Sequence, residues 1–171
     1  IASGLAKAHA ENVVHRDVKP ANVLLTQNGQ GRAGATSVQA KLLDFGLAKM
    51  AGESALTRTG SSIGTPLYMS PEQIGGASDA RTDVWSLGVV LYEMLTGERP
   101  FGGSNSATAM YSILHREPTP LALASPGLSD DLQPILDRAL AKGVDRRYPS
   151  AADFADDLAA AASGEMSATQ P

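Results

Sequence analysis

The sequence contains no cysteine, and this absence excludes two kinds of structure. Without thiols the chain can form neither a disulfide framework nor a thiolate zinc site, which fits a reducing compartment. A bound metal would have to use oxygen ligands or the three histidines. The sequence also lacks an apolar run near the length of a membrane span and lacks a leader at its start. We therefore predict a soluble, cytoplasmic chain that makes no membrane contact itself.

A basic surface is missing as well. The 14 Lys and Arg residues are scattered along the chain, and the formal net charge is −4. Because no basic stripe is present, we expect no nucleic-acid partner. What the chain does have is apolar content: 43% of its 171 residues. This is enough for one domain, or one large lobe, with a real core.

The first half of the chain predicts a helix, a hairpin and a long loop. "IASGLAKAHAENVVH" has a helical apolar pattern from its first position with no capping residue before it, so the chain is expected to begin inside a helix, as a fragment of something longer. A strand at 23–26 and a returning strand at 41–46 are joined by a flexible insertion at 27–40, rich in Gly, Ala and Ser. Residues 47–71 lack periodicity and predict a long exposed loop.

The second half predicts helices. Residues 82–100 are apolar nearly all round and closed by Gly97, as expected of a helix in the middle of a core. A looser amphipathic helix follows at 106–115. Two later helices are expected to begin at N-caps, Ser129 and Ser150, and the last fades into a polar tail. The predicted lobe is mainly α-helical with one small β-hairpin.

Five motifs occur along the chain in this order: "HRDVKPAN" (15–22), "DFG" (44–46), "GTPLYMSPE" (64–72), "DVWSLG" (83–88) and "RRYPSA" (146–151). Their order resembles the C-terminal lobe of a protein kinase catalytic domain, whose known signatures include the first two. The resemblance covers residues 1–161 and implies the kinase fold, α+β as a family, with this chain as its mainly helical lobe and 162–171 as a tail or linker. The residues in these motifs are most similar to those of the eukaryotic-like (Hanks-type) kinases of bacteria.

The resemblance implies chemistry for the polar loop. Phosphoryl transfer needs metal ions, a positioned hydroxyl and charge stabilisation. Asp17 resembles the catalytic aspartate and Lys19 the lysine that neutralises the transferred phosphate; the alternatives are a turn-capping acid and a solvated lysine. Asn22 and Asp44 resemble the two magnesium ligands, although an Asn in a turn often only bonds the backbone. The implied binding set for ATP and Mg²⁺ is Lys19, Asn22, Leu24 and Asp44.

Further residues are implied around that set. Phe45 and Gly46 complete the "DFG" triplet, and His15 is interpreted as a packed structural residue and not a proton carrier. Lys19 together with "GTPLYMSPE" is similar to the Ser/Thr branch of the family. In that branch Thr65 would hydrogen-bond the catalytic Asp and Lys; the alternative is an ordinary loop threonine.

Regulatory and architectural roles are implied too. Arg16 resembles an arginine that grips a phosphate on the activation loop, the alternative being a solvated side chain. Glu72 and Arg147 resemble a buried ion pair that anchors the end of the activation segment. Asp83 resembles the carboxylate that holds the catalytic loop by its amides. Four residues are equal candidates for the phosphate acceptor: Thr57, Thr59, Ser61 and Ser62.

The function implied is a protein serine/threonine kinase in the full-length parent. The glycine-rich strand pair, the strand lysine and the helix glutamate of a complete kinase are not in this sequence. We therefore expect the chain alone to be nearly inactive. Implied partners are ATP, a protein substrate with Ser or Thr, the N-terminal lobe of the parent, and a second copy for trans-autophosphorylation. Two alternatives remain: a pseudokinase-like binding scaffold and a small-molecule phosphotransferase of similar fold.

Overall fold

Helix α3 (Ala80–Thr96) is the centre of the fold. The Asp79 side chain caps its first turn by accepting the Arg81 amide, and the helix ends at Gly97 in the left-handed conformation (φ 76°). Most of the helix is buried, as its apolar sequence predicts. Three helices pack against it: α1 (Ala2–Ala10), α6 (Leu132–Ala139) and α7 (Ala151–Ser163).

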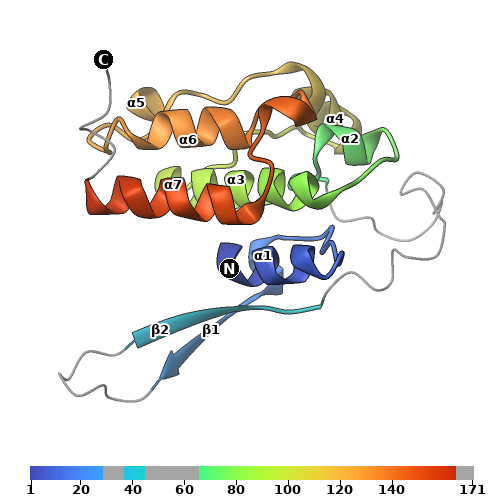
Figure 1. The fold of residues 1–171 in the computed structure, drawn as a ribbon. Coiled ribbons are helices and arrows are strands. Elements are labelled where there is room, and N and C mark those ends of the chain that lie inside the picture. Colours follow the sequence, from blue (N-terminus) through green and yellow to red (C-terminus); the bar gives the residue numbers. More distant parts are fainter. Residues whose placement is uncertain (29–36, 45–65, 165–171) are drawn as a thin grey trace.

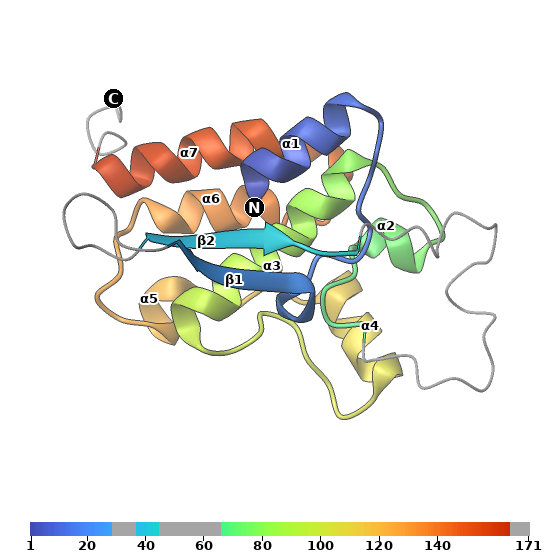
Figure 2. The same ribbon diagram turned by 90° about the horizontal axis from the view of Figure 1, so that it is seen from below.

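The computed structural model describes residues 1–28, 37–44 and 66–164. Figure 1 shows the hairpin on one side, α1 in the middle, and a helical body in which α3 and α7 face α1. Seen from below, the hairpin crosses in front of α3 and α1 lies beside α7 (Figure 2). The remaining elements are β1 (Val23–Asn28), β2 (Ser37–Leu42), α2 (Pro71–Ile74), α4 (Ser106–His115), α5 (Leu121–Ala124) and the 3-10 turns η1 (Pro20–Asn22) and η3 (Val144–Arg146). None of the helices in these ranges is long and apolar enough to span a bilayer.

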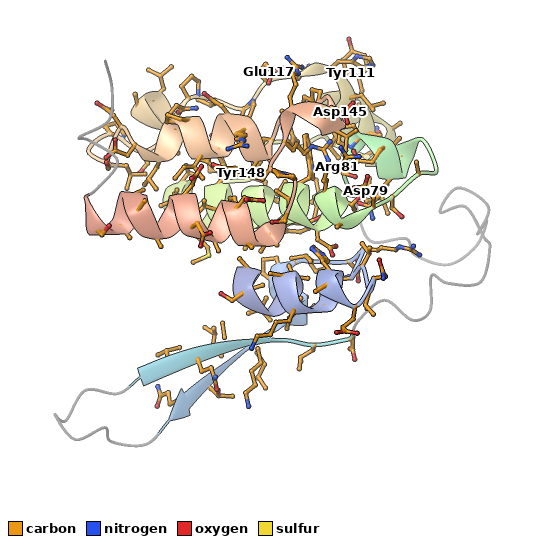
Figure 3. The ribbon with its side chains drawn as sticks, in the orientation of Figure 1. Asp79, Arg81, Tyr111, Glu117, Asp145 and Tyr148 are labelled. Carbon is orange, nitrogen blue, oxygen red and sulfur yellow. The ribbon has the colours of Figure 1, made fainter. Side chains whose placement is uncertain are left out.

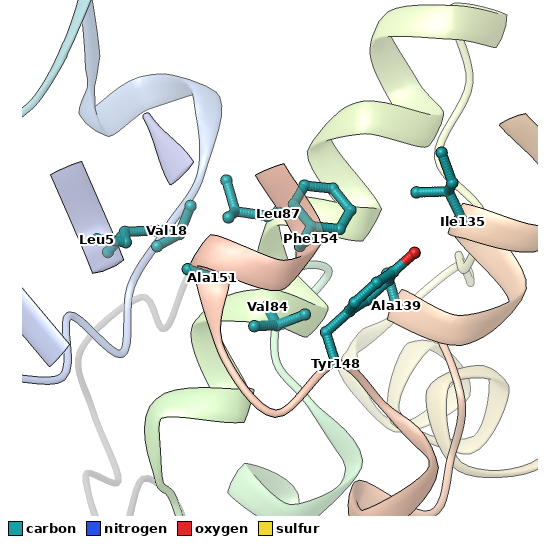
Figure 4. Close-up of a cluster of buried hydrophobic side chains, with 9 residues drawn as sticks. All are labelled: Leu5, Val18, Val84, Leu87, Ile135, Ala139, Tyr148, Ala151 and Phe154. Atoms are coloured by element: carbon teal, nitrogen blue, oxygen red, sulfur yellow. The ribbon is translucent and has the colours of Figure 1, made fainter. Parts of the chain in front are cut away.

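Two apolar clusters form the core on either side of α3. The first brings Leu5 of α1 and Val18 of the polar loop against Val84, together with Tyr148 just before α7 and Phe154 on α7 (Figure 4). The second is built around Trp85, whose ring stacks on Phe101 at 5.3 Å between centroids. Because Val18 belongs to the first cluster, the loop that carries the candidate acid is fixed to the core itself.

The hairpin is longer than the sequence predicts. Antiparallel pairing runs from Val23↔Leu42 to Asn28↔Ser37, so the prediction of a flexible insertion is wrong for 27–28 and 37–40. Residues 37–42 alternate polar and apolar side chains, with Val38, Ala40 and Leu42 on one face, and this strand signal was overlooked. Gln27 and Asn28 are both polar, and backbone hydrogen bonds hold this end of the ladder whatever the side chains are. The tip of the hairpin, 29–36, lies outside the described residues.

Two other boundaries differ from the predictions. The segment before α2 is not fully exposed, because Leu67 and Ser70 are buried against the helical body. Ser129 does not cap a helix: its hydroxyl accepts the Asp131 amide in a local turn, and α6 begins only at Leu132. The mainly helical fold with one hairpin is confirmed, as are the cap at Ser150 and the helix at 106–115.

Candidate active site

The polar loop 15–22 is held by a buried carboxylate at the start of α3. Asp83 is fully buried, and its two oxygens accept the backbone amides of His15 and Arg16, each at 2.8 Å. The ring Nε2 of His9, on α1, also contacts Asp83 at 2.8 Å. A carboxylate that accepts several hydrogen bonds from fixed groups is well compensated for its burial. The central helix therefore sets the path of the loop.

His15 joins the loop to the end of the hairpin. Its Nε2 lies 3.0 Å from the Leu43 carbonyl oxygen, which can only accept, so this nitrogen carries the proton. The other nitrogen, Nδ1, is then free to accept the Asp17 amide at 3.2 Å. Both contacts fit one neutral tautomer of a fully buried ring. The side chain thus links the segment of Asp17 to the residue before Asp44.

Asp17, Lys19 and Asn22 form one hydrogen-bonded group. Lys19 Nζ lies 2.8 Å from Asp17 Oδ2, and Asn22 Nδ2 donates to the Asp17 carbonyl at 2.7 Å and to Oδ2 at 3.1 Å. The side chains of Lys19 and Asp17 are 36% and 37% exposed, so an outside molecule can reach them. The structure therefore brings three of the sequence-predicted site residues together at an accessible edge.

The register of the hairpin brings the backbone before Asp44 next to Asn22. The Leu43 amide donates to the Asn22 carbonyl at 2.8 Å, one step beyond the Val23↔Leu42 pair, and Asp44 follows directly. Its backbone is left-handed (φ 53°), so the chain turns away from the strand direction at this exposed residue. Two candidate oxygen ligands, on Asn22 and Asp44, therefore belong to adjoining backbone segments.

This donor set suits magnesium. The Nδ2 of Asn22 donates two hydrogen bonds to Asp17. The other end of the amide, Oδ1, therefore points away from Asp17. Magnesium is commonly held by one or two protein oxygens, with phosphate oxygens and water completing the shell. No group of three or more His, Cys, Asp or Glu side chains suited to a metal occurs in 1–28, 37–44 or 66–164. The candidate site is thus a pair of ligands and not a closed metal cage.

The other predicted binding and regulatory residues have different positions. Leu24 lies on β1 opposite Lys41 and is 46% exposed. Arg16 has a left-handed backbone (φ 66°), and within the described part of the chain its buried Nε has no hydrogen-bond partner. The remaining predicted residues lie outside the described ranges: Phe45, Gly46, Thr57, Thr59, Ser61, Ser62 and Thr65.

Outside the loop 15–22, the structure pairs Glu72 with Arg147. The two guanidinium nitrogens lie 2.6 and 2.7 Å from the two carboxylate oxygens, and the arginine side chain is 0% exposed. Thr82 Oγ1 also donates to the carboxylate at 3.0 Å. Burial would raise the pKa of Glu72, but the hydrogen bonds and charge of Arg147 outweigh it and hold this pKa below its ordinary value. The bidentate pair fixes α2 to the helical body.

A surface ion network supports the turn that carries Arg147. Arg81 lies 2.6 Å from Asp79 and 2.8 Å from Asp145, and Figure 3 shows these side chains between the start of α3 and η3. The Arg81 carbonyl in turn accepts Arg147 Nη1 at 3.3 Å. Exposed pairs contribute only about 0–1 kcal/mol each, so this network positions the turn more than it stabilises the fold.

Sequence reasoning missed three residues near these groups. His9 gave no signal, since its contact with Asp83 joins residues 74 positions apart. Lys142 rests on the Phe101 ring at 3.8 Å and donates to the Ile113 carbonyl at 2.7 Å; burial lowers its pKa to about 8. Gln73 could have been noticed as the third residue after Ser70, the spacing of a capping box.

The loop carries an acid, a lysine and an asparagine and is fixed to a buried helix, and a buried ion pair anchors the neighbouring α2, as the motifs predict for a kinase C-terminal lobe. Residues 1–157 match the family described as "Protein kinase domain". The chain belongs to this protein kinase family. The match covers nearly all of the described core. It confirms the fold class that the motifs predict.

Similar proteins include bacterial kinases and proteins of solved structure. Serine/threonine-protein kinase PknB of Mycobacterium tuberculosis is 42% identical over 161 residues, which are 92% of this chain and 24% of that protein. A probable serine/threonine-protein kinase of Streptomyces coelicolor is 39% identical over 168 residues, 96% of this chain and 24% of that protein. The crystal structure of Rad53 1–466 in complex with AMP-PNP has a TM-score of 0.69 at 25% identity, covering 92% of this chain and 37% of that one. The chain spans about a quarter of the length of the curated relatives.

Proposed function

We propose that the chain is the C-terminal lobe of a serine/threonine protein kinase catalytic domain, and that its full-length parent transfers the γ-phosphate of ATP to Ser or Thr hydroxyls of proteins. The observation that carries the proposal is the hydrogen-bonded group of Asp17, Lys19 and Asn22 on a loop fixed by Asp83. Kinase-type transfer depends on positioning and electrostatics, and this group supplies both. The names of the bacterial relatives support the choice of Ser and Thr.

Each residue of the group has a role that follows from its contacts. Asp17 presents its carboxylate at an accessible edge, where it orients the substrate hydroxyl and accepts its proton. Lys19, bonded to the same carboxylate, supplies positive charge beside the transferred group. Asn22 and Asp44 would hold the metal through one amide and one carboxylate oxygen. Magnesium, when bound, neutralises charge on the phosphate oxygens.

The hairpin surface supports a second lobe in the parent. Four large apolar side chains are exposed on the hairpin and just after it: Leu24, Leu25, Val38 and Leu43. The register places Leu25 and Val38 on one face of the hairpin and Leu24 and Leu43 on the other. Large apolar side chains exposed on both faces of a hairpin favour contact with a further part of the protein. The covering unit proposed here is the N-terminal lobe of the parent, which would complete the nucleotide site and leave Leu24 facing the base.

The isolated chain is therefore expected to bind ATP weakly and to transfer phosphate poorly. One wall of the nucleotide site is present, but the groups expected on the other wall are not in this sequence. Equilibrium dialysis with labelled ATP and Mg²⁺ compares the 171-residue chain with the full-length parent. Equal affinity of the two proteins for ATP argues against the two-lobe account.

The function itself is tested with the purified parent, Mg²⁺ and ATP labelled at the γ-phosphate. A mixture of generic protein substrates and a panel of small alcohols are offered in parallel. We expect label on proteins, and phosphoserine or phosphothreonine after acid hydrolysis. Label on small alcohols alone identifies a small-molecule phosphotransferase instead, and ATP binding without transfer identifies a scaffold.

A further inference from the structure

The residue before the candidate acid has a backbone that must be held in place. Arg16 is left-handed (φ 66°), a conformation that a bulky residue adopts only where its surroundings impose it. Its amide donates to Asp83 at 2.8 Å, which fixes one side of the residue. Its carbonyl accepts Gln73 Nε2 at 2.9 Å, and this bond crosses 57 positions of sequence to α2. The glutamine therefore fixes the other side.

The same bond fixes the peptide group of Asp17. The Arg16 carbonyl and the Asp17 amide belong to one planar peptide unit. Gln73 holds the carbonyl end of this unit, and His15 Nδ1 accepts its amide at 3.2 Å. A plane held at both ends cannot rotate, so the direction in which the Asp17 side chain leaves the backbone is set.

The orientation of the glutamine amide is itself determined. Its Oε1 accepts the Ser70 amide at 3.0 Å, so Nε2 is the end directed at Arg16. In return the Gln73 amide donates to the Ser70 hydroxyl at 3.4 Å, completing a capping box at the start of α2. Its neighbour Glu72 anchors α2 through the buried pair with Arg147. A fixed helix thus presents a fixed donor to the loop.

We propose that Gln73 is a positioning residue for phosphoryl transfer, holding the peptide plane between Arg16 and Asp17 so that the carboxylate points at the substrate hydroxyl. This inference rests on the proposed kinase function. The bond from Gln73 also couples α2 to the loop 15–22, because any displacement of α2 would remove the donor from the Arg16 carbonyl. Capping alone does not explain the contact, because a capping box needs only the bonds to Ser70.

Gln73→Glu separates capping from positioning. The introduced carboxylate still accepts the Ser70 amide, but it has no hydrogen to donate and sets an oxygen against the Arg16 carbonyl. In the full-length parent we expect kcat to fall about tenfold or more, because small misplacements of a reacting group are costly. KM for ATP should stay close to the wild-type value, and the thermal midpoint should fall modestly, because one hydrogen bond is lost and two oxygen atoms face each other.

The pH profile supplies a readout that a purely structural role does not move. When the introduced carboxyl is protonated it regains a donor, and its place against a carbonyl oxygen favours the protonated form. The ratio of variant kcat to wild-type kcat is therefore expected to rise as the pH is lowered. Ser70→Ala is the control: it removes the capping bond from the Gln73 amide and the bond of the Ser70 hydroxyl to Glu72, but it keeps the bond from Gln73 to Arg16. It should lower the thermal midpoint with kcat within about twofold of wild type.

Hydrogen exchange makes the test independent of kinase activity. The Asp17 amide of the Gln73→Glu parent is expected to exchange faster than in wild type, with exchange in α3 unchanged. An inactive wild-type parent overturns the proposed function, and the exchange result alone then decides the role of Gln73. An active parent whose Gln73→Glu variant keeps wild-type kcat and exchange overturns the positioning role. Faster exchange throughout α3 also overturns it, because the glutamine would then stabilise the fold generally.

Discussion

At the scale of single residues, burial separates the chemical groups from the architectural ones. Asp17 and Lys19 are about one-third exposed and can meet a substrate, whereas the side chain of Arg147 has no exposure at all. An exposed charge tolerates the loss of its partner because water replaces it. A buried charge does not, and this difference leads to opposite expectations for two carboxylates in the same lobe.

Glu72→Ala should destabilise the fold more than Asp17→Ala. Loss of Glu72 leaves the buried Arg147 guanidinium without its carboxylate, which typically costs about 3–5 kcal/mol. Loss of the partly exposed Asp17 should cost less than about 1 kcal/mol. Thermal or urea unfolding of the two variants measures the difference. Equal midpoints would mean that the ion pair does not anchor the fold.

The same pair predicts acid sensitivity. The pKa of Glu72 in the folded state lies below its ordinary value of 4.5, mainly because Arg147 outweighs the effect of burial. The stabilisation is therefore complete above pH 4.5 and is lost as the pH falls through the folded-state pKa. Unfolding midpoints measured from neutral pH downward should fall more steeply for wild type than for Glu72→Gln. Parallel curves would assign the acid sensitivity to other groups.

At the scale of elements, α3 organises the lobe. It carries Asp83 for the loop, Trp85 for the second apolar cluster, and Ser86, whose hydroxyl donates to the Tyr68 carbonyl at 2.8 Å. A single buried helix thus holds both the loop of the candidate acid, through Asp83, and the segment before α2, through Ser86. Close packing of α6 against α3 keeps this arrangement rigid, and at Gly88 the two helices leave no room for a side chain.

Gly88→Ala should separate α3 from α6. A Cβ at this position would lie 2.9 Å from the Ala139 Cβ and 3.1 Å from Leu140 Cδ2, so one helix must shift. We expect a loss of about 1–3 kcal/mol in unfolding free energy. Gly4→Ala on α1 is the control, since nothing lies within 4 Å of the added carbon. It should gain about 0.5–1 kcal/mol from helix propensity, and a similar gain at position 88 would refute close packing there.

Local sequence signals predicted much of this architecture. The bounds of α4, the cap at Ser150 and the burial of α3 follow from periodicity and capping residues. The end of β1 was missed because Gln27 and Asn28 are both polar and ladder bonds do not depend on apolar side chains. The start of β2 does alternate polar and apolar residues, so its sequence signal was overlooked. Within the candidate site, His9 and Gln73 were missed for another reason. Each makes its contact with a residue more than 50 positions away, which leaves no local pattern.

At the scale of the whole molecule, the described lobe consists of a helical body with a buried core and a two-stranded hairpin. The helical body buries two apolar clusters. Large apolar side chains are exposed on both parts of the described lobe, among them Leu24, Leu25 and Val38 on the hairpin and Met94 and Leu123 on the helical body. The candidate residues Asp17, Lys19 and Asn22 lie on the loop that leads into this hairpin. The nucleotide site is therefore proposed to form where the hairpin side of this lobe meets another part of the parent chain.

The most direct test of the account is the rate of phosphate transfer by the full-length parent carrying Asp17→Asn. The substitution keeps the size of the side chain and removes its ability to accept a proton. The account predicts a fall in kcat of about 10²–10⁴-fold with the unfolding midpoint nearly unchanged. Transfer at the wild-type rate by this variant would contradict the assignment of Asp17, and with it the active site proposed for this lobe.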